Sequence, residues 1–347
     1  MFHKILFATD FSEYANKTLD CIAGLPGARE IILLHVLEEA RNPRGGGEIV
    51  ETLTPDERNR LKEAKHRLES LNKSLKVVTR VKTSSDIPGA IIEAAEEHGV
   101  TLIVVGARGN SIVEGILLGS VSVAIVRRSK ITVLVMRHKI VAGLAGRAYE
   151  MWCPMILSRI LCPIDFSVCS DRAITLLKTT KGVGQVILLH VVSHGESESE
   201  LETTVSEAGV KLAEIGRDLS QAGVNVRTLV KRGNPGSEIT RIAEEEDVSV
   251  IWISSLGKGW FRELLLGSTA YDVAMNSKQP VIIVRTTKSK RENQALSENN
   301  QYRYDVCLLY TSDAADDLLC VALGGRRIIK KKTDINNLPT RHTRHIK

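Results

Sequence analysis

The sequence predicts two tandem doubly wound α/β domains, each with a five-stranded parallel sheet and helices on both faces. The first observation behind this prediction is an internal repeat, which indicates a duplicated domain of roughly 140 residues. Four segments return in the same order at an offset of 148 to 155 residues: ILFATDFS at 5–12 as ILCPIDFS at 160–167, IILLHV at 31–36 as VILLHV at 186–191, VKTSSDIPGAIIEAAEE at 81–97 as VKRGNPGSEITRIAEEE at 230–246, and LLGS at 117–120 as LLGS at 265–268.

The second observation is the pattern of apolar residues within each repeat. The apolar runs are short and continuous rather than alternating, which is typical of parallel strands covered on both faces. In the first repeat they lie near 3–9, 30–36, 76–82, 101–105 and 131–136. Helical segments lie between these runs, and the alternation of strand and helix predicts the doubly wound arrangement.

Start signals mark the helices between these strands. Ser12 can cap the first helix and Thr54 the second, where Pro55 fits the first helical turn. A third helix is expected after Pro88, and a fourth after Gly119, where apolar residues recur at helical spacing.

Composition bounds the class of protein. A chain of 347 residues with 43% hydrophobic and 25% charged residues is typical of a soluble protein of two domains. The N-terminus is interpreted as a first strand rather than a signal peptide. No apolar run approaches the roughly 20 residues of a membrane span. The six cysteines form no CxxC pair. These features predict a cytoplasmic protein without a membrane or metal site. Most of the +6 charge lies in residues 301–347, so nothing favours nucleic acid as a partner.

The repeat also predicts the domain boundaries. The segment CLLYTSDAADDLLCVALGGRRIIKKK, which starts at Cys307, back-translates readily to a transposon-type sequencing adapter, so we interpret it as a translated library artefact. The expected organisation is a first domain at 1–138, a linker at 139–157, a second domain at 158–287, a polar tail at 288–306 and the artefact at 307–347.

Ligands of doubly wound sheets bind at the carboxyl ends of the strands, where the winding direction switches. Ala8, Thr9 and Asp10 follow the first predicted strand, and Val36 follows the second. The fourth is followed by GARGNSIVEGILLGSVS at 106–122. We therefore expect three separate segments to meet at one crevice.

The glycine-rich segment is suited to phosphate. Gly106 and Gly109 let the backbone approach a ligand, and Gly119 and Ser120 introduce a helix whose N-terminus attracts anions. The segment lacks the G-K-[ST] ending of a P-loop and is not a G-x-G-x-x-G fingerprint. Turn glycines with an ordinary helix cap remain an alternative interpretation.

The spacing Gly106-x2-Gly109-x9-Gly119-Ser120 resembles the G-x2-G-x9-G-[S/T] pattern of the universal stress protein family. The D-x-S at Asp10, the LLHV at 33–36 and the strand ITVLVM at 131–136 are also similar to that family. The second repeat resembles it through PID at 163–165, LLHV at 188–191, GNP at 233–235 and LLGS at 265–268.

The resemblance implies an adenine nucleotide alpha hydrolase-like fold that holds ATP, with Mg²⁺ as a companion and AMP or ADP as alternatives. It also implies that the two domains pair through their fifth strands, here 131–136 and 281–285, with a further homodimer and an unidentified protein partner left open. The residues that it places around the nucleotide are Ala8, Thr9, Asp10, Val36, Gly106, Arg108, Gly109, Gly119, Ser120, Val121 and Ser122 in the first domain, and Pro163, Ile164, Asp165, Val191, Gly257, Gly267, Ser268 and Thr269 in the second.

The second repeat departs from the pattern. Ser254 stands where Gly106 stands, and its Cβ is expected to crowd a ligand, while Thr269 replaces Val121. These differences predict a stronger site in the first domain and a weak or empty one in the second. In the first domain, Ala8 stands where the family often has proline.

Three functions remain open at this point. The leading one is an ATP-binding stress-response regulator that acts as a nucleotide-dependent switch or partner-binding module. A slow ATPase or nucleotidyl transferase is less favoured, because no lysine is fixed at the phosphates and no catalytic constellation accompanies Asp10 or Asp165. The third is a ligand-free dimerisation scaffold. His35 and His190 are interpreted as hydrogen-bonded structural residues rather than catalytic ones.

Overall fold

The computed structural model describes residues 2–39, 53–107, 118–143, 146–151, 155–193, 197–257 and 266–285. Strands and helices alternate along the first repeat, which we call domain 1. Its strands are β1 (Lys4–Ala8), β2 (Glu30–Glu38), β3 (Lys76–Ser84), β4 (Leu102–Gly106) and β5 (Val133–Met136), and its helices are α1 (Glu13–Ala23), α2 (Pro55–Leu71), α3 (Ile87–Glu97) and α4 (Ser120–Arg128).

The second repeat, domain 2, has the same order of elements. Its strands are β8 (Arg159–Pro163), β9 (Gln185–Val192), β10 (Asn225–Arg232), β11 (Val250–Ser254) and β12 (Val281–Val284), and its helices are α5 (Val168–Thr179), α6 (Glu198–Gln221), α7 (Pro235–Glu245) and α8 (Ser268–Asn276). None of the described helices has the length and apolar character needed to cross a bilayer.

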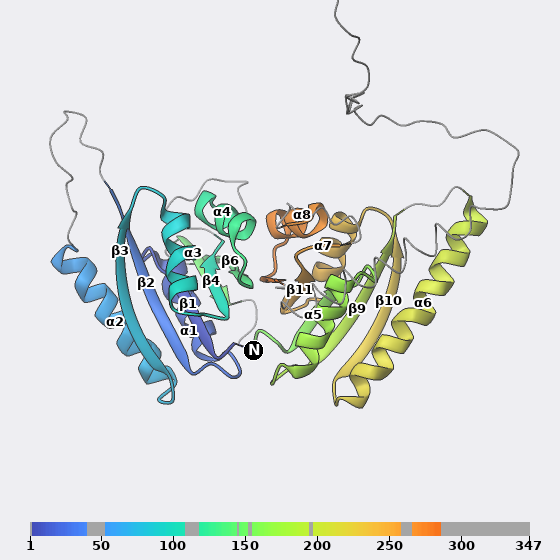
Figure 1. Cartoon of the computed structure of the whole chain (residues 1–347), viewed down its shortest axis with the longest axis horizontal. Helices are drawn as coiled ribbons and strands as arrows, with labels where there is room; N and C mark the ends of the chain where they lie inside the picture. The colour runs from blue at the N-terminus through green and yellow to red at the C-terminus, as the bar shows by residue number, and fades with distance from the viewer. Residues whose placement is uncertain are drawn as a thin grey trace, which may run out of the picture. The chain divides into compact units, whose positions relative to one another are not determined.

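The strands of both domains form one ten-stranded sheet in the order β10-β9-β8-β11-β12-β5-β4-β1-β2-β3 (Figure 1). All pairings within a domain are parallel, whereas β12 and β5 pair antiparallel, with Ile282 opposite Leu134. This is the fifth-strand pairing that the resemblance implies, and it gives each of these edges a partner. In each domain the winding switches between the first and fourth strands, so the carboxyl ends of β1 and β4, and of β8 and β11, lie side by side.

The core lies on the two faces of this sheet. Most buried apolar residues of α1, α2, α5 and α6 belong to one cluster, and those of α3, α4, α7 and α8 belong to the other, together with Tyr14 of α1. The first cluster crosses between the domains, where the rings of Phe2 and Trp252 pack edge to face with centroids 6.0 Å apart. The predicted doubly wound α/β fold with helices on both faces is therefore confirmed.

The predicted helix starts agree with the structure to within a few residues. The hydroxyl of Ser12 accepts a hydrogen bond from the backbone N–H of Ala15, and Thr54 and Glu57 form a reciprocal capping box. The third helix starts at Ile87, just before Pro88 rather than after it as expected, because the carboxylate of Asp86 caps it. Local capping chemistry thus fixes where these helices begin.

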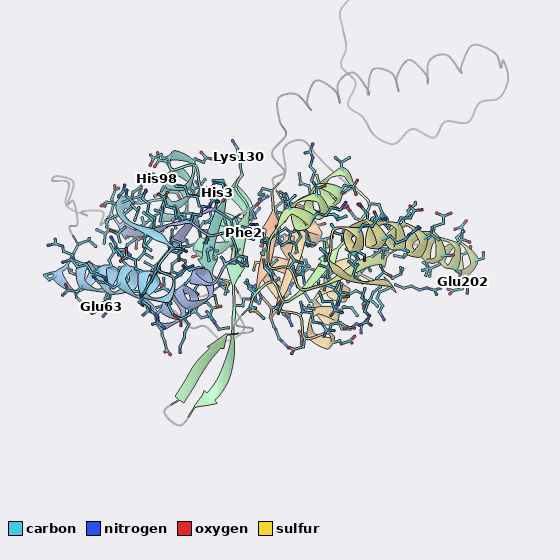
Figure 2. The ribbon with its side chains drawn as sticks, turned by 90° about the horizontal axis from the view of Figure 1, so that it is seen from below. Phe2, His3, Glu63, His98, Lys130 and Glu202 are labelled. Carbon is cyan, nitrogen blue, oxygen red and sulfur yellow. The ribbon has the colours of Figure 1, made fainter. Side chains whose placement is uncertain are left out.

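A two-stranded hairpin occupies most of the segment that the sequence assigned to a linker. It consists of β6 (His138–Gly143) and β7 (Gly146–Met151), and Figure 2 shows it extending away from the large sheet. His138 anchors its start, because the ring packs against Tyr14 with centroids 4.5 Å apart and its Nε2 lies 3.2 Å from the hydroxyl of Thr18. The polar tail and the adapter-like segment lie outside the described residues.

The buried His138 predicts a pH-dependent stability. Burial, helped by the charge of Lys17, lowers the pKa of His138 from 6.5 to about 4, so the unfolded chain binds a proton that the folded chain does not. We expect the free energy of unfolding to fall as the pH drops from 6.5 towards 4, by on the order of 3 kcal/mol, and to level off below.

Urea unfolding of the wild type and of His138→Gln, at pH 7 and pH 4.5, measures this effect. The loss between the two pH values should be smaller in the variant. An equal loss in the two proteins would assign the pH dependence to other groups.

Candidate functional site

The turn after the first strand of each domain has the same unusual backbone. Phe11 and Phe166 both have a φ of 59°, a left-handed conformation that bulky residues rarely adopt. The carboxylates of Asp10 and Asp165 accept hydrogen bonds from the backbone N–H two residues ahead, at 3.0 and 3.1 Å. Strain of this kind persists where surrounding contacts fix it, and it gathers at functional sites.

The histidines of the second strands hold these turns in place. Nδ1 of His35 lies 2.9 Å from the carbonyl oxygen of Thr9, and Nδ1 of His190 lies 2.6 Å from that of Ile164. Each imidazole also packs on the strained phenylalanine of its domain, with centroids 4.5 Å apart. These contacts agree with the interpretation of both histidines as structural, and they fix the two aspartates at the sheet edge.

The fourth helix of each domain begins without a side-chain cap. In the described part of the chain, the other six helices have a Ser, Thr, Asp or Asn side chain that accepts a backbone N–H at the N-terminus, whereas α4 and α8 start after Gly119 and Gly267 and have none. The first N–H groups of a helix have no partner within it. The N-termini of α4 and α8 can therefore donate these groups to an anion.

In each domain, the residue that precedes the glycine-rich loop and the residue that follows it are hydrogen-bonded to each other. The backbone N–H of Gly119 donates to the carbonyl of Ala107 at 2.7 Å, and that of Gly267 donates to Ser255 at the same distance. Each bond joins the helix start to the end of the fourth strand. The two phosphate-contacting points that the sequence predicted are thus adjacent at these ends, although Arg108 and Gly109 lie outside the described residues.

Ser122, one of the residues predicted around the nucleotide, does not direct its hydroxyl proton to a ligand. Its Oγ donates a 2.6 Å hydrogen bond to the carbonyl oxygen of Gly106 and the residue is buried. A hydroxyl has a single proton, and the proton of Ser122 is used in this hydrogen bond, which holds α4 against β4. The backbone N–H of Ser122, in the first turn of α4, can still donate to a ligand.

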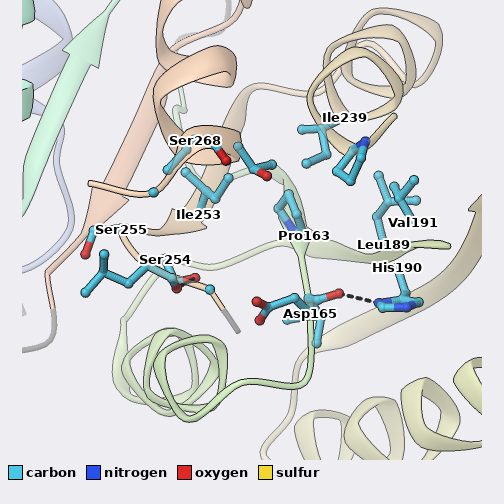
Figure 3. Close-up of a pocket in the computed structure, with 17 residues that line it drawn as sticks. Pro163, Asp165, Leu189, His190, Val191, Ile239, Ile253, Ser254, Ser255 and Ser268 are labelled. Atoms are coloured by element: carbon cyan, nitrogen blue, oxygen red, sulfur yellow. Dashed lines mark hydrogen bonds between the residues drawn. The ribbon is translucent and has the colours of Figure 1, made fainter. Parts of the chain in front are cut away.

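Domain 2 contains a cavity of about 420 Å³ at the carboxyl ends of β8 and β11. Figure 3 shows Asp165 and His190 on one side and Ser268 and Ile239 on another. The predicted site residues of this domain all line it: Pro163, Ile164, Asp165, Val191, Gly257, Gly267, Ser268 and Thr269. Its volume lies within the usual range of small-molecule sites, and it is lined by apolar side chains with a few convergent polar groups.

Ser254 lines this cavity without filling it. Its side chain turns into its own loop, where Oγ donates to the carbonyl of Leu256 at 3.0 Å. Gly257 has a definite steric role, because a Cβ there would lie 2.5 Å from Oδ2 of Asp165. The glycine therefore lets the carboxylate lie against the loop.

The sequence reasoning missed one wall of the cavity. Pro235 and Ile239 of α7 line it, together with Ile253 and Leu189 from the strands. The signal was present in the Gly-Asn-Pro turn before α7, which places that helix beside the carboxyl end of β9. In domain 1, Ala8, Thr9, Asp10, Val36, Gly106, Gly119, Ser120 and Val121 stand at the equivalent ends of β1, β2, β4 and α4.

The arrangement offers an apolar slot between strand ends, a carboxylate that can accept a hydrogen bond from a hydroxyl, and an uncapped helix N-terminus that can bind an anion. The family model described as "Universal stress protein family" matches residues 1–137 and 157–285. The chain belongs to the universal stress protein family.

Two curated universal stress proteins show the extent of the likeness. Universal stress protein MJ0577 of Methanocaldococcus jannaschii is 32% identical over an alignment of 160 residues, and the match covers 39% of this chain and 99% of that protein. Universal stress protein YxiE of Bacillus subtilis is 34% identical over 87 residues, 25% of this chain and 59% of that one.

A solved universal stress protein from Archaeoglobus fulgidus is similar over both domains. It covers 82% of this chain and 97% of its own, with a TM-score of 0.55 and 24% identity. At that identity, the likeness establishes the tandem fold.

Proposed function

We propose that this universal stress protein binds an adenine nucleotide, preferentially ATP, and acts as a nucleotide-dependent regulator in a stress response. The observation that supports it most is the pair of uncapped helices α4 and α8, one of which opens on a cavity of about 420 Å³ beside Asp165. The adenine would lie between the ends of the first, second and fourth strands, and the phosphates at the helix N-terminus.

The proposal assigns the stronger site to domain 1. Gly106 has no Cβ, whereas Ser254 stands at its place in domain 2, and Arg108 stands where domain 2 has Leu256. A cation at that point would favour a polyphosphate. The cavity in domain 2 remains a second, weaker site of the same kind.

Calorimetric titration of the full chain with ATP tests both statements. We expect two unequal sites, with the tighter lost in Asp10→Ala and the weaker lost in Asp165→Ala. Asp218→Ala is the matched control, because that carboxylate is exposed and pairs only with Lys178 among the described residues. Two equal sites that persist in Asp10→Ala would refute the assignment, and steady ATP turnover lost in that variant would favour an enzyme.

A further inference from the structure

We propose that each candidate site is positioned by an arginine of the other domain: Arg285 of domain 2 for α4, and Arg137 of domain 1 for α8. This inference rests on the proposed function, since it concerns the helices assigned to phosphate. The two arginines hold equivalent places, because each directly follows the fifth strand of its own domain.

Their contacts are reciprocal across the domain boundary. Nη2 of Arg285 donates to the carbonyl oxygen of Val126, in the last turn of α4. Nη2 of Arg137 donates to the carbonyl oxygen of Ala274, in the last turn of α8, and Nη1 donates to Ser277 just beyond that helix. Val126 and Ala274 are equivalent residues of the repeat, so the two domains exchange the same contact.

Both guanidinium groups are buried, since Arg137 is 4% and Arg285 is 8% exposed. Within the described residues, Arg285 forms no ion pair, and its Nε and Nη1 have no hydrogen-bond partner. Burial lowers the pKa of Arg285 to about 10, which leaves it charged at neutral pH. A buried cation without a carboxylate destabilises a fold, so we infer that the contact serves to fix the carbonyl end of the helix, where the dipole is negative.

The helices connect this contact to the candidate sites. α4 has nine residues and is therefore about 13 Å long, with Val126 near one end and Gly119 before the other. A helix this short moves as a rigid rod, so a shift of its last turn displaces the N–H groups at its start. The two helices also meet directly, because the guanidinium carbon of Arg127 lies 5.7 Å from the centre of the Tyr271 ring.

Hydrogen–deuterium exchange on the full chain, titrated with ATP, tests the proposal, because peptides covering 118–128 and 266–276 report the two sites separately. In Arg285→Met, the ATP concentration that gives half-maximal protection should rise by about 10-fold for the α4 peptide and stay unchanged for the α8 peptide. Arg137→Met should do the reverse. Arg227→Met, which removes an exposed pair with Glu246 inside domain 2, is the control.

In this crossed pattern, each substitution weakens ATP binding only in the other domain, which distinguishes positioning of the site from a general loss of stability. Effects confined to the domain that carries the substitution, equal effects on both sites, or no effect would each overturn the proposal. If the wild type shows no protection by ATP, the proposed function fails. Exchange without ligand then decides the inference, since Arg285→Met must still speed exchange in the last turn of α4 only. Should a Met variant fail to fold, Arg285→Lys and Arg137→Lys, which keep the charge but not the two-pronged donor, are expected to give the same crossed pattern.

Discussion

Replacement of Gly119 by Asp is expected to abolish nucleotide binding in domain 1 and to leave the fold at least as stable. Gly119 has φ −73° and ψ 158°, which any residue adopts, and a Cβ there would meet nothing nearer than the carbonyl oxygen of Ala107 at 3.6 Å. An aspartate at this position caps the helix, which contributes a few tenths of a kcal/mol relative to glycine, and complements the helix dipole, which contributes about 0.3–1 kcal/mol. The glycine is therefore not required by the fold.

The same carboxylate would occupy the N–H groups that we assign to phosphate. It would also repel the phosphate charge, so the affinity of domain 1 for ATP should fall by about 100-fold or more, the equivalent of roughly 3 kcal/mol. Calorimetric titration and urea unfolding of the same Gly119→Asp sample measure the two effects. Gly119→Ser, which caps without a charge, should lose less affinity. Unchanged binding in domain 1 by Gly119→Asp would show that the start of α4 does not hold the ligand.

Replacement of Trp252 by Ala is expected to lower the free energy of unfolding by about 3–5 kcal/mol. Trp252 is completely buried, and its indole N–H donates to the carbonyl oxygen of Ala173 at 3.1 Å. Its ring packs on Phe2 of domain 1, so the substitution opens a cavity where the two domains share a core. It also leaves the carbonyl of Ala173 without that donor.

Urea unfolding measures this loss, with Trp252→Phe as the matched variant. Phenylalanine keeps most of the apolar contact with Phe2 but not the hydrogen bond, so we expect it to lose only about 1–2 kcal/mol. A loss below about 1 kcal/mol for Trp252→Ala would mean that the cluster shared by the domains contributes little to stability.

The internal repeat and the apolar runs were sufficient to predict the fold. Continuous short runs such as IILLHV are typical of strands buried on both faces, and cap residues such as Ser12 and Thr54 indicated where the helices between them begin. The pairing of β5 with β12 came from the family resemblance rather than from periodicity. An apolar edge strand shows that it needs a partner but not which one.

Features that depend on contacts distant in the sequence were not predictable. The hairpin of β6 and β7 carries no strong alternation, so a segment with two glycines was interpreted as a linker. The hydrogen bond from the Ser122 hydroxyl to the carbonyl of Gly106 joins residues 16 positions apart, so it depends on the packing of α4 against β4. Arg137 and Arg285 follow their strands as ordinary basic residues would, and their burial against the opposite domain is a property of the assembled sheet.

The most direct test of the central claim is to purify the full chain from cells without added nucleotide, denature it, and identify any released small molecule by mass spectrometry with its stoichiometry. We predict an adenine nucleotide, about one per chain, as expected for one strong site in domain 1 and one weak site in domain 2. Two per chain would show that Ser254 is fully tolerated and would contradict the inequality of the sites. No nucleotide, with none bound on later titration, would contradict the account as a whole and leave a ligand-free tandem scaffold.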